Sequence, residues 1–395
     1  MEDAVVIVRE FDQSRDKESV EHVERSCEVG PSGKVSLFTN LHGDPICRVR
    51  HSPPYLMLVA EIGEEIVGMI RGCIKTVTCG EKVCRNTKIN KHVPILTKVA
   101  YVLGLRVSPP NRRLGIGLKL VQRMEDWFRS NGVEYAYMAT ENDNHASVRL
   151  FTEKCGYSKF RTPSILVNPV YAHSIAVSKK ISIVRIPPSE AEYIYRRQFS
   201  NMEFFPRDID VVLTNKLNLG TFVAVPRGYG PWPGAAEFLS SPPRSWAMMS
   251  LWNSKDMFTF EVRGVSWFKR TIAKTTRVVD RAFQFMGLPS VPELFKPFGL
   301  LFMYGLGGEG ERALDMVKAL CANAHNVARE RGCAVVATEV SSCDPLRVAI
   351  PHWKMLSCYE DLWCVKRLED YSGGLIGDWT KSPPGVSIFV DPREF

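Results

Sequence analysis

The stretch Arg112-Arg113-Leu114-Gly115-Ile116-Gly117 combines residue types that can bind a pyrophosphate. Glycines let the backbone approach an anion closely, and the free N–H groups of a first helical turn point at it. The two arginines add fixed positive charge. An alternative is a tight strand–helix turn with arginines at the surface.

The residues around this stretch predict the elements that would position it. The apolar run 99–107 precedes it and predicts a strand. Apolar residues then recur at helical spacing, and glycine at 132 suits a left-handed cap at the end of that helix. The apolar positions of this helix are Leu120, Val121, Met124, Trp127 and Phe128.

Strand and helix patterns alternate along the chain, which predicts an α/β fold with a mixed, partly parallel sheet. The expected strands are 5–11, 55–61, 66–78, 99–107, 135–140, 181–186, 220–225, 246–252 and 300–304. Helices are expected over 12–27, from Leu118 onward, over 144–155 and after Gly310. The polar, basic segment from Cys79 to Pro94 is expected to be an insertion.

The second half of the chain repeats features of the first. Ala139-Thr140-Glu141 matches Ala337-Thr338-Glu339, and 148–150 matches 346–348 at the same displacement. We therefore expect two domains, residues 1–178 and 179–395. The second glycine-containing segment, 305–310, has Glu309 and the adjoining Glu311 where the first has arginines. Because negative charge repels a pyrophosphate, the second copy is expected to be degenerate.

Composition is that of an ordinary globular protein. The chain has 395 residues, 45% of them apolar, and a formal net charge of +8. This basic excess suits an anionic ligand or an acidic partner without selecting one. No stretch approaches the roughly 20 apolar residues of a membrane span. The first residues lack a signal-peptide pattern, and eleven scattered cysteines fit a reducing intracellular compartment.

Two further features have structural explanations. Cys79 and Cys84 have no second pair at zinc spacing, so no metal site is expected. Basic residues between 269 and 281 alternate with apolar ones, which predicts a surface helix with an apolar underside. Binding of nucleic acid or an acidic partner by this helix is the alternative.

The order of these motifs resembles the GNAT superfamily of acetyl-CoA-dependent N-acetyltransferases. The resemblance covers Leu105 to Tyr157, with Arg-x-x-Gly-x-Gly at 112–117, Asn144, Leu150-Phe151 and 153–157. The whole chain is further similar to the plant HOOKLESS-type N-acetyltransferases. This resemblance implies tandem GNAT-like domains, an acetyl-CoA co-substrate and no metal. It also implies a nuclear location and a role in hormone-linked differential growth.

In this family the acetyl thioester enters a gap between two splayed parallel strands, here 100–107 and 135–140. Unpaired backbone groups in such a gap can bind the pantetheine arm and polarise the thioester carbonyl. The resemblance assigns cofactor binding to Leu105, Arg106, Val107, Arg112, Arg113, Leu114, Gly115, Ile116, Gly117 and Asn144. Asn144 equally suits a helix cap.

The acceptor implied by the resemblance is an amine, such as a protein lysine, an N-terminus or a histone tail. A free lysine has a pKa of about 10.4, so neutralising it near pH 7 costs roughly 4–5 kcal/mol. Glu141, Tyr101 and His145 are the candidate bases, and the sequence does not rank them. The family often has a tyrosine acid where this chain has Phe151, which cannot donate a proton.

Three functions remain open on the sequence. The first is acetyl transfer to a protein amine, and the second is a cofactor-binding regulatory scaffold that self-associates or binds partners. The third is acetylation of a small amine in a pocket formed by the long loop 30–54. Direct contact with nucleic acid or a membrane is not expected.

Overall fold

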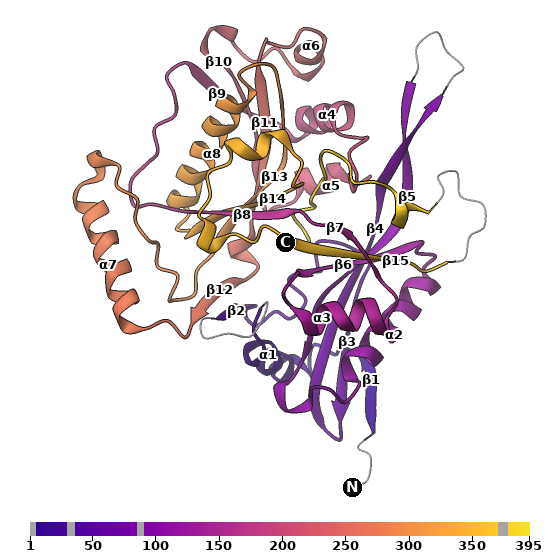
Figure 1. Ribbon diagram of the computed structural model, residues 1–395. Helices are drawn as coiled ribbons and strands as arrows, with labels where there is room; N and C mark the ends of the chain where they lie inside the picture. The colour runs from indigo at the N-terminus through magenta and orange to yellow at the C-terminus, as the bar shows by residue number, and fades with distance from the viewer. Residues whose placement is uncertain (1–4, 30–35, 85–90, 370–377) are drawn as a thin grey trace.

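Most strands belong to two large mixed sheets, seen in a computed structural model that describes residues 5–29, 36–84, 91–369 and 378–395 (Figure 1). The first sheet, lower right in Figure 1, has seven strands, and the second, upper left, has six. Each sheet contains one parallel strand pair among antiparallel pairs, β5–β6 in the first and β13–β14 in the second. The expected mixed α/β fold is confirmed.

The first sheet is built largely from the N-terminal half of the chain. Its strand order is β1 (Val6–Glu10), β3 (Tyr55–Ile62), β4 (Glu65–Cys84), β5 (Lys91–Val107), β6 (Tyr135–Glu141), β15 (Asp361–Arg367) and β7 (Ser158–Arg161). The accompanying helices are α1 (Lys17–Ser26), α2 (Ile116–Ser130) and α3 (His145–Arg149), which runs on into a π-helical turn, Leu150–Lys154.

The second sheet has the strand order β8 (Ser164–Pro169), β14 (Val335–Val340), β13 (Leu300–Glu309), β11 (Trp246–Asn253), β10 (Asn218–Pro226) and β9 (Ile181–Ile186). Its helices are α4 (Pro188–Gln198), α5 (Ile209–Thr214), α6 (Ala235–Ser240), α7 (Trp267–Ala282) and α8 (Ala313–Glu330). A separate ribbon pairs β2 (Ser36–Asn40) with β12 (Thr259–Arg263).

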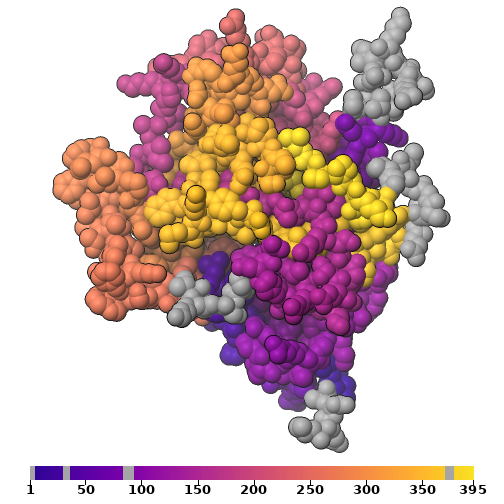
Figure 2. Space-filling model, viewed as in Figure 1, coloured from indigo at the N-terminus to yellow at the C-terminus, as the bar shows by residue number. Residues whose placement is uncertain are grey.

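The two sheets exchange strands. β15, close to the C-terminus, is inserted between β6 and β7 of the first sheet, while β8 pairs with β14 of the second. The expected boundary between the two halves is at residue 178. β8 comes before this boundary but joins the second sheet, and β15 comes after it but joins the first. Figure 2 shows the yellow C-terminal residues lying against the purple surface of the N-terminal half. Each sheet is therefore completed by a strand from the other half of the chain.

Helix α2 packs tightly on the first sheet, as its apolar spacing predicts. Leu120, Val121, Met124 and Phe128 are fully buried. A Cβ placed on Gly72 of β4 would lie 2.7 Å from the Met124 sulfur, so only glycine allows the helix to approach this closely. The left-handed Gly132 follows the helix as expected.

Two strands of the sheets extend beyond their expected ends. The expected strand bounds beside the segment 79–94 are wrong, since β4 continues to Cys84 and β5 begins at Lys91. Likewise, Gly305–Glu309 continues β13, pairing with β11 around a bulge.

The basic segment forms helix α7 as expected, but the prediction that the helix buries an apolar underside is wrong. Ala273 and Asp280 face inward, whereas Trp267 and Phe268 are 77% and 60% exposed. The helix is held instead by polar contacts, since Asp280 accepts a hydrogen bond from the backbone N–H of Ala172 at 2.7 Å. The spacing of apolar residues predicted that they would be buried under the helix. Polar contacts such as that of Asp280 attach the helix instead.

Among the helices of the described chain, none is both long and apolar enough to cross a lipid bilayer.

Candidate active site

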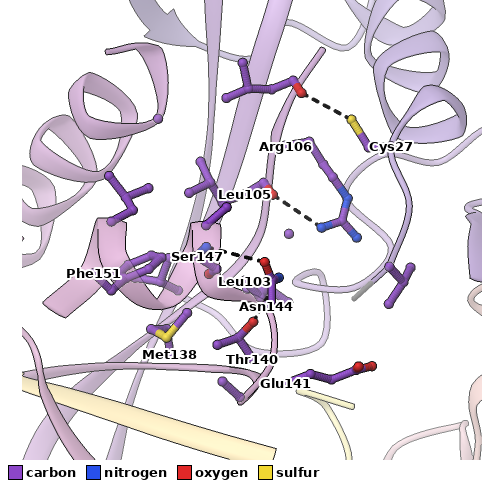
Figure 3. Close-up of a pocket in the computed structure, with 18 of the residues that line it drawn as sticks. Cys27, Leu103, Leu105, Arg106, Met138, Thr140, Glu141, Asn144, Ser147 and Phe151 are labelled. Carbon is purple, nitrogen blue, oxygen red and sulfur yellow. Dashed lines mark hydrogen bonds between the residues drawn. The ribbon is translucent and has the colours of Figure 1, made fainter. Parts of the chain in front are cut away.

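A cavity of about 920 Å³ lies where the parallel strands β5 and β6 diverge. Their pairing runs from Val99 opposite Tyr135 to Val102 opposite Met138 and then stops. Beyond this point the two strands form the walls of the cavity. Figure 3 shows their side chains around it, Leu105 and Arg106 from β5 and Thr140 and Glu141 from β6.

A bulge at Gly104 bends β5 at the start of the gap. The register of β5 with β4 passes from Leu103 to Arg106, so Gly104 and Leu105 lie outside both ladders. Gly104 has φ +62°, and a Cβ there would lie 2.5 Å from the Arg71 guanidinium. The bulge leaves backbone of β5 available to a ligand in the gap.

Arg71 is fully buried beneath this bulge and is fixed on several sides. Its guanidinium donates to the Pro45 carbonyl at 2.6 Å and to the Glu24 carboxylate at 3.2 Å. Arg106 forms a second ion pair with Glu24 at 3.4 Å. Although burial opposes ionisation, Arg71, Arg106 and Arg48 together lower the pKa of Glu24. The bulge is therefore supported from below by buried ion pairs between arginines and Glu24.

The glycine-containing turn forms the cationic end of the cavity. Gly115 adopts φ +77° and precedes the first turn of α2, and the Arg112 side chain donates to the Val107 carbonyl at 3.2 Å. Helix N-terminal N–H groups and arginine side chains therefore face the same cavity, which suits an anionic phosphate.

All but one of the residues assigned to ligand binding from the sequence line this cavity. Those that do are Leu105, Arg106, Val107, Arg112, Arg113, Gly115, Ile116, Gly117 and Asn144. Leu114 is not among the lining residues and is 58% exposed. Asn144 caps α3 by accepting from the Ser147 N–H at 3.4 Å, and its amide donates to Thr140 at 3.2 Å. The capping alternative for Asn144 therefore holds, and its side chain also borders the cavity.

The three candidate bases also line the cavity, in different environments. Tyr101 is buried beside the Tyr137 ring at 4.8 Å, and burial together with the Glu394 charge raises the pKa of its phenol well above the usual value. The phenol therefore keeps its proton near neutral pH. Partial burial and the charge of Asp143 raise the pKa of Glu141. His145 is exposed at the start of α3.

Phe151 also lines the cavity and is buried against Tyr157, whose ring meets it edge to face at 5.1 Å. Tyr157 itself is not a lining residue and lies in the core under α2. The structure therefore does not bring the Tyr157 hydroxyl to the place that a tyrosine at 151 would occupy.

The opposite end of the cavity is acidic and contains residues that sequence reasoning missed. Glu339 of β14, Asp361 and Trp363 of β15 and Glu394 all line it. The Trp363 indole N–H donates to Glu339 at 2.9 Å and to Asp361 at 3.0 Å. The repeated Ala-Thr-Glu motif was a signal for Glu339, because it makes Glu339 the counterpart of Glu141.

Burial changes the acidity of these carboxyl groups. It raises the pKa of Asp361 to about 6 and that of Glu339 well above its usual value, with the Asp361 charge adding to the latter. Burial raises the pKa of Glu394 as well, against the opposing charge of Lys75. The Lys75 Nζ lies 2.7 Å from one Glu394 oxygen, and the Tyr137 hydroxyl donates to the other Glu394 oxygen at 2.6 Å.

The corresponding gap in the second sheet is nearly closed. β13 and β14 also pair over four positions, from Leu300 to Met303, before diverging. The cavity found there is about 10 Å³, with Ile388 and Val390 of the C-terminal segment among its walls. The Tyr195 hydroxyl donates to the Gly305 carbonyl at 3.2 Å. The second copy therefore has the strand geometry without room for a ligand.

In the described part of the chain, no group of three or more His, Cys, Asp or Glu side chains is arranged to hold a metal ion.

The fold, the interrupted parallel pair and the glycine turn define an acyl-CoA N-acyltransferase architecture. The Acetyltransferase (GNAT) family profile matches residues 19–157. A relative described as "Probable N-acetyltransferase HLS1", from Arabidopsis thaliana, is 66% identical over 99% of this chain and all of its own length. The chain belongs to the GNAT acetyltransferase family.

Two other proteins are similar over nearly the whole chain. "Acetyl transferase GW6a" of Oryza sativa subsp. japonica is 39% identical over 99% of this chain and 98% of its own. Saccharomyces cerevisiae N-myristoyltransferase, crystallised with myristoyl-CoA, matches in fold with a TM-score of 0.53 at 9% identity. That match covers 92% of this chain and 79% of the other.

Proposed function

We propose that this protein transfers an acetyl group from acetyl-CoA to a primary amine of another protein, a lysine side chain or an N-terminus. The observation that carries the proposal is a cavity of about 920 Å³ lined by arginines at one end and by carboxyl groups at the other. The cationic end suits the pyrophosphate of CoA, and the acidic end suits an ammonium group.

The backbone geometry supports the acyl-transfer step. With the pyrophosphate at residues 112–117, the pantetheine arm would extend along β5 past Leu105, which lies outside both ladders. Backbone groups there can hold the arm and polarise the thioester carbonyl as the amine attacks it. The neutral Tyr101 phenol, buried beside the gap, is a further hydrogen-bond donor.

An acceptor assay tests this proposal. Purified protein is incubated with acetyl-CoA and a panel of lysine peptides, N-terminal peptides, histone-tail peptides and polyamines, and free CoA is measured. We expect CoA release that depends on the acceptor and is faster with peptides than with polyamines. Absence of acetyl-CoA binding would contradict the proposal.

A second function is favoured by one observation. Phe151 is buried where a tyrosine acid would assist the departing thiolate, so this protein could retain acetyl-CoA and act as a regulatory scaffold. Tight binding of acetyl-CoA without CoA release on any acceptor would support the scaffold. Release of CoA on a peptide would rule it out.

We also propose a nuclear protein acceptor, which rests on the similarity to plant relatives and on the basic net charge of the chain. Imaging of a fluorescent fusion in plant cells tests the location. Acetylation of histone-tail peptides in the assay above tests the acceptor.

A further inference from the structure

Two carboxyl groups from different sheets meet at the acidic end of the cavity. Glu339 lies near the end of β14 in the second sheet, and Asp361 begins β15, which the first sheet has taken from the C-terminal half. The two residues are 9% and 5% exposed, and both line the cavity that the glycine turn also lines. Strand exchange is what brings them together.

The Glu339 and Asp361 carboxyl groups together hold one proton. One indole N–H reaches both carboxyl groups, so they lie close together, and two adjacent carboxylates oppose ionisation of both. The Trp363 N–H donates to both, so it holds the pair in place without neutralising it. Within the described residues neither Glu339 nor Asp361 forms an ion pair. The pair is therefore an anion of charge −1 that can accept one further proton.

Glu394, the other buried carboxyl group of the cavity, is arranged differently. Lys75 lies 2.7 Å from one of its oxygens and the Tyr137 hydroxyl donates to the other. Its negative charge is thus already compensated by a cation. Glu141 lies opposite Asp361 in the β6–β15 ladder but is only partly buried and faces the cavity nearer to solvent. These contacts favour the Glu339–Asp361 pair as the proton acceptor.

We propose that the Glu339–Asp361 pair is the general base that takes the proton from the incoming ammonium group, with Asp361 as its ionised member. This inference rests on the proposed acetyl transfer and identifies its substrate as a cationic amine. It also assigns the C-terminal half a catalytic role, because both carboxyl groups come from that half.

The proton and electron balance of the step is complete. The ammonium group gives one proton to Asp361, and the freed nitrogen lone pair attacks the thioester carbonyl carbon. The C–N bond forms, the C–S bond breaks, and the CoA sulfur leaves with the electron pair. The second proton lost by the nitrogen goes to that sulfur, giving an acetamide and free CoA. Asp361 then returns its proton to solvent at the edge of the cavity, where Glu141 lies opposite it.

Other titratable groups face this pair from each neighbouring element, and their charges belong to any pH profile. They are Glu394 of the C-terminal segment, Tyr101 of β5, Glu141 of β6 and Cys358 ahead of β15. Cys358 and Tyr101 keep their protons near neutral pH because burial raises the pKa of each. The Glu394 charge is opposed by Lys75. Of these groups, only Glu141 adds an uncompensated titration to that of the pair.

The experiment compares full-length wild type with Asp361→Asn, Glu339→Gln and the control Glu360→Gln. Glu360 is exposed and adjacent in sequence, and it is not among the residues that line the cavity. The readouts are kcat for CoA release against pH with one peptide acceptor and the Kd for acetyl-CoA. Thermal unfolding checks that each variant is folded.

We expect Asp361→Asn to lose at least about 100-fold in kcat while its Kd for acetyl-CoA stays within about twofold. Glu339→Gln should lose less than about 10-fold, because Asp361 and its hydrogen bond from Trp363 are retained. Glu360→Gln should match wild type. The wild-type kcat should fall below pH 6, as Asp361 becomes protonated, and Asp361→Asn should lack that decline.

Different failures have different meanings. An Asp361→Asn variant with kcat within about threefold of wild type and the same pH profile overturns this inference and leaves acetyl transfer standing. A wild type that binds no acetyl-CoA, or releases CoA with no acceptor, overturns both. If Asp361→Asn does not fold, the wild-type profile decides, since a kcat constant from pH 5 to 8 would overturn the inference.

Discussion

Asp361 of β15 lies directly opposite Glu141 of β6, although the two residues belong to different halves of the chain. Directly opposed residues share one face of a sheet, so both carboxyl groups face the same cavity. The pairing shows that the N-terminal sheet is completed by the C-terminal half.

The exchanged strand predicts that the N-terminal half does not fold alone. A fragment of residues 1–178 lacks β15, which pairs with both β6 and β7, so the edge of β6 beside the cavity would be left unpaired. We expect this fragment to aggregate or to unfold without cooperativity, as followed by circular dichroism. A soluble fragment with a cooperative transition and full acetyl-CoA affinity would contradict the role given to β15.

Gly104→Ala should destabilise the protein and weaken acetyl-CoA binding. The new Cβ would contact the buried Arg71 guanidinium, which is fixed by Pro45 and Glu24 and cannot move away. We expect a loss of roughly 2–4 kcal/mol in the free energy of unfolding, measured by urea denaturation.

Gly63→Ala is the matched control for this substitution. Gly63 has φ +62°, the same as Gly104, but a Cβ there would meet nothing within 4 Å. It should cost about 1 kcal/mol from backbone strain alone. Equal losses for the two variants would show that the contact with Arg71 contributes nothing.

Lys75→Met should destabilise the protein by about 3–5 kcal/mol near neutral pH, because the buried Glu394 loses its cation. Without Lys75 the folded-state pKa of Glu394 rises further above its unfolded value. The loss should therefore be small at low pH, where Glu394 is protonated, and should grow as the pH rises through the unfolded pKa. Urea denaturation at several pH values measures this, with the exposed Lys318→Met as control. A loss independent of pH would contradict it.

Asp361→Asn should stabilise the protein while reducing its activity. Because burial raises the pKa of Asp361 to about 6, the folded state disfavours the carboxylate. The contribution of Asp361 to the free energy of unfolding is therefore fully present below the unfolded pKa of about 3.9. It is lost as the pH rises through the folded pKa of about 6. We expect the melting temperature of the variant to exceed wild type by about 2 °C at pH 8 and to match it near pH 4. A lower melting temperature at pH 8 would contradict this account.

The cationic end of the site could be predicted from sequence because its parts are contiguous. The strand, the glycine turn and α2 follow one another between Val99 and Ser130, and local patterns define each of them. Leu114 is the exception, because which turn residue faces a ligand depends on the turn geometry.

The acidic end could not be predicted, because it depends on pairing between distant segments. Glu339 and Asp361 come together only when β15 is inserted beside β6 while β14 stays in the second sheet. Periodicity indicates that a segment is a strand and does not indicate which sheet it joins. The repeated Ala-Thr-Glu motif marked Glu339 as equivalent to Glu141 without placing the two in one cavity.

The most direct test of the account is calorimetric titration of acetyl-CoA into wild type, Gly115→Glu and Gly132→Glu. Gly115 and Gly132 lie at opposite ends of α2, both with positive φ and open space at the Cβ position, so the two variants differ chiefly in their distance from the anion site. We predict one acetyl-CoA per chain for wild type and Gly132→Glu, and at least 10-fold weaker binding for Gly115→Glu, whose carboxylate repels the pyrophosphate. No binding by wild type, two sites per chain, or unchanged affinity in Gly115→Glu would contradict the account.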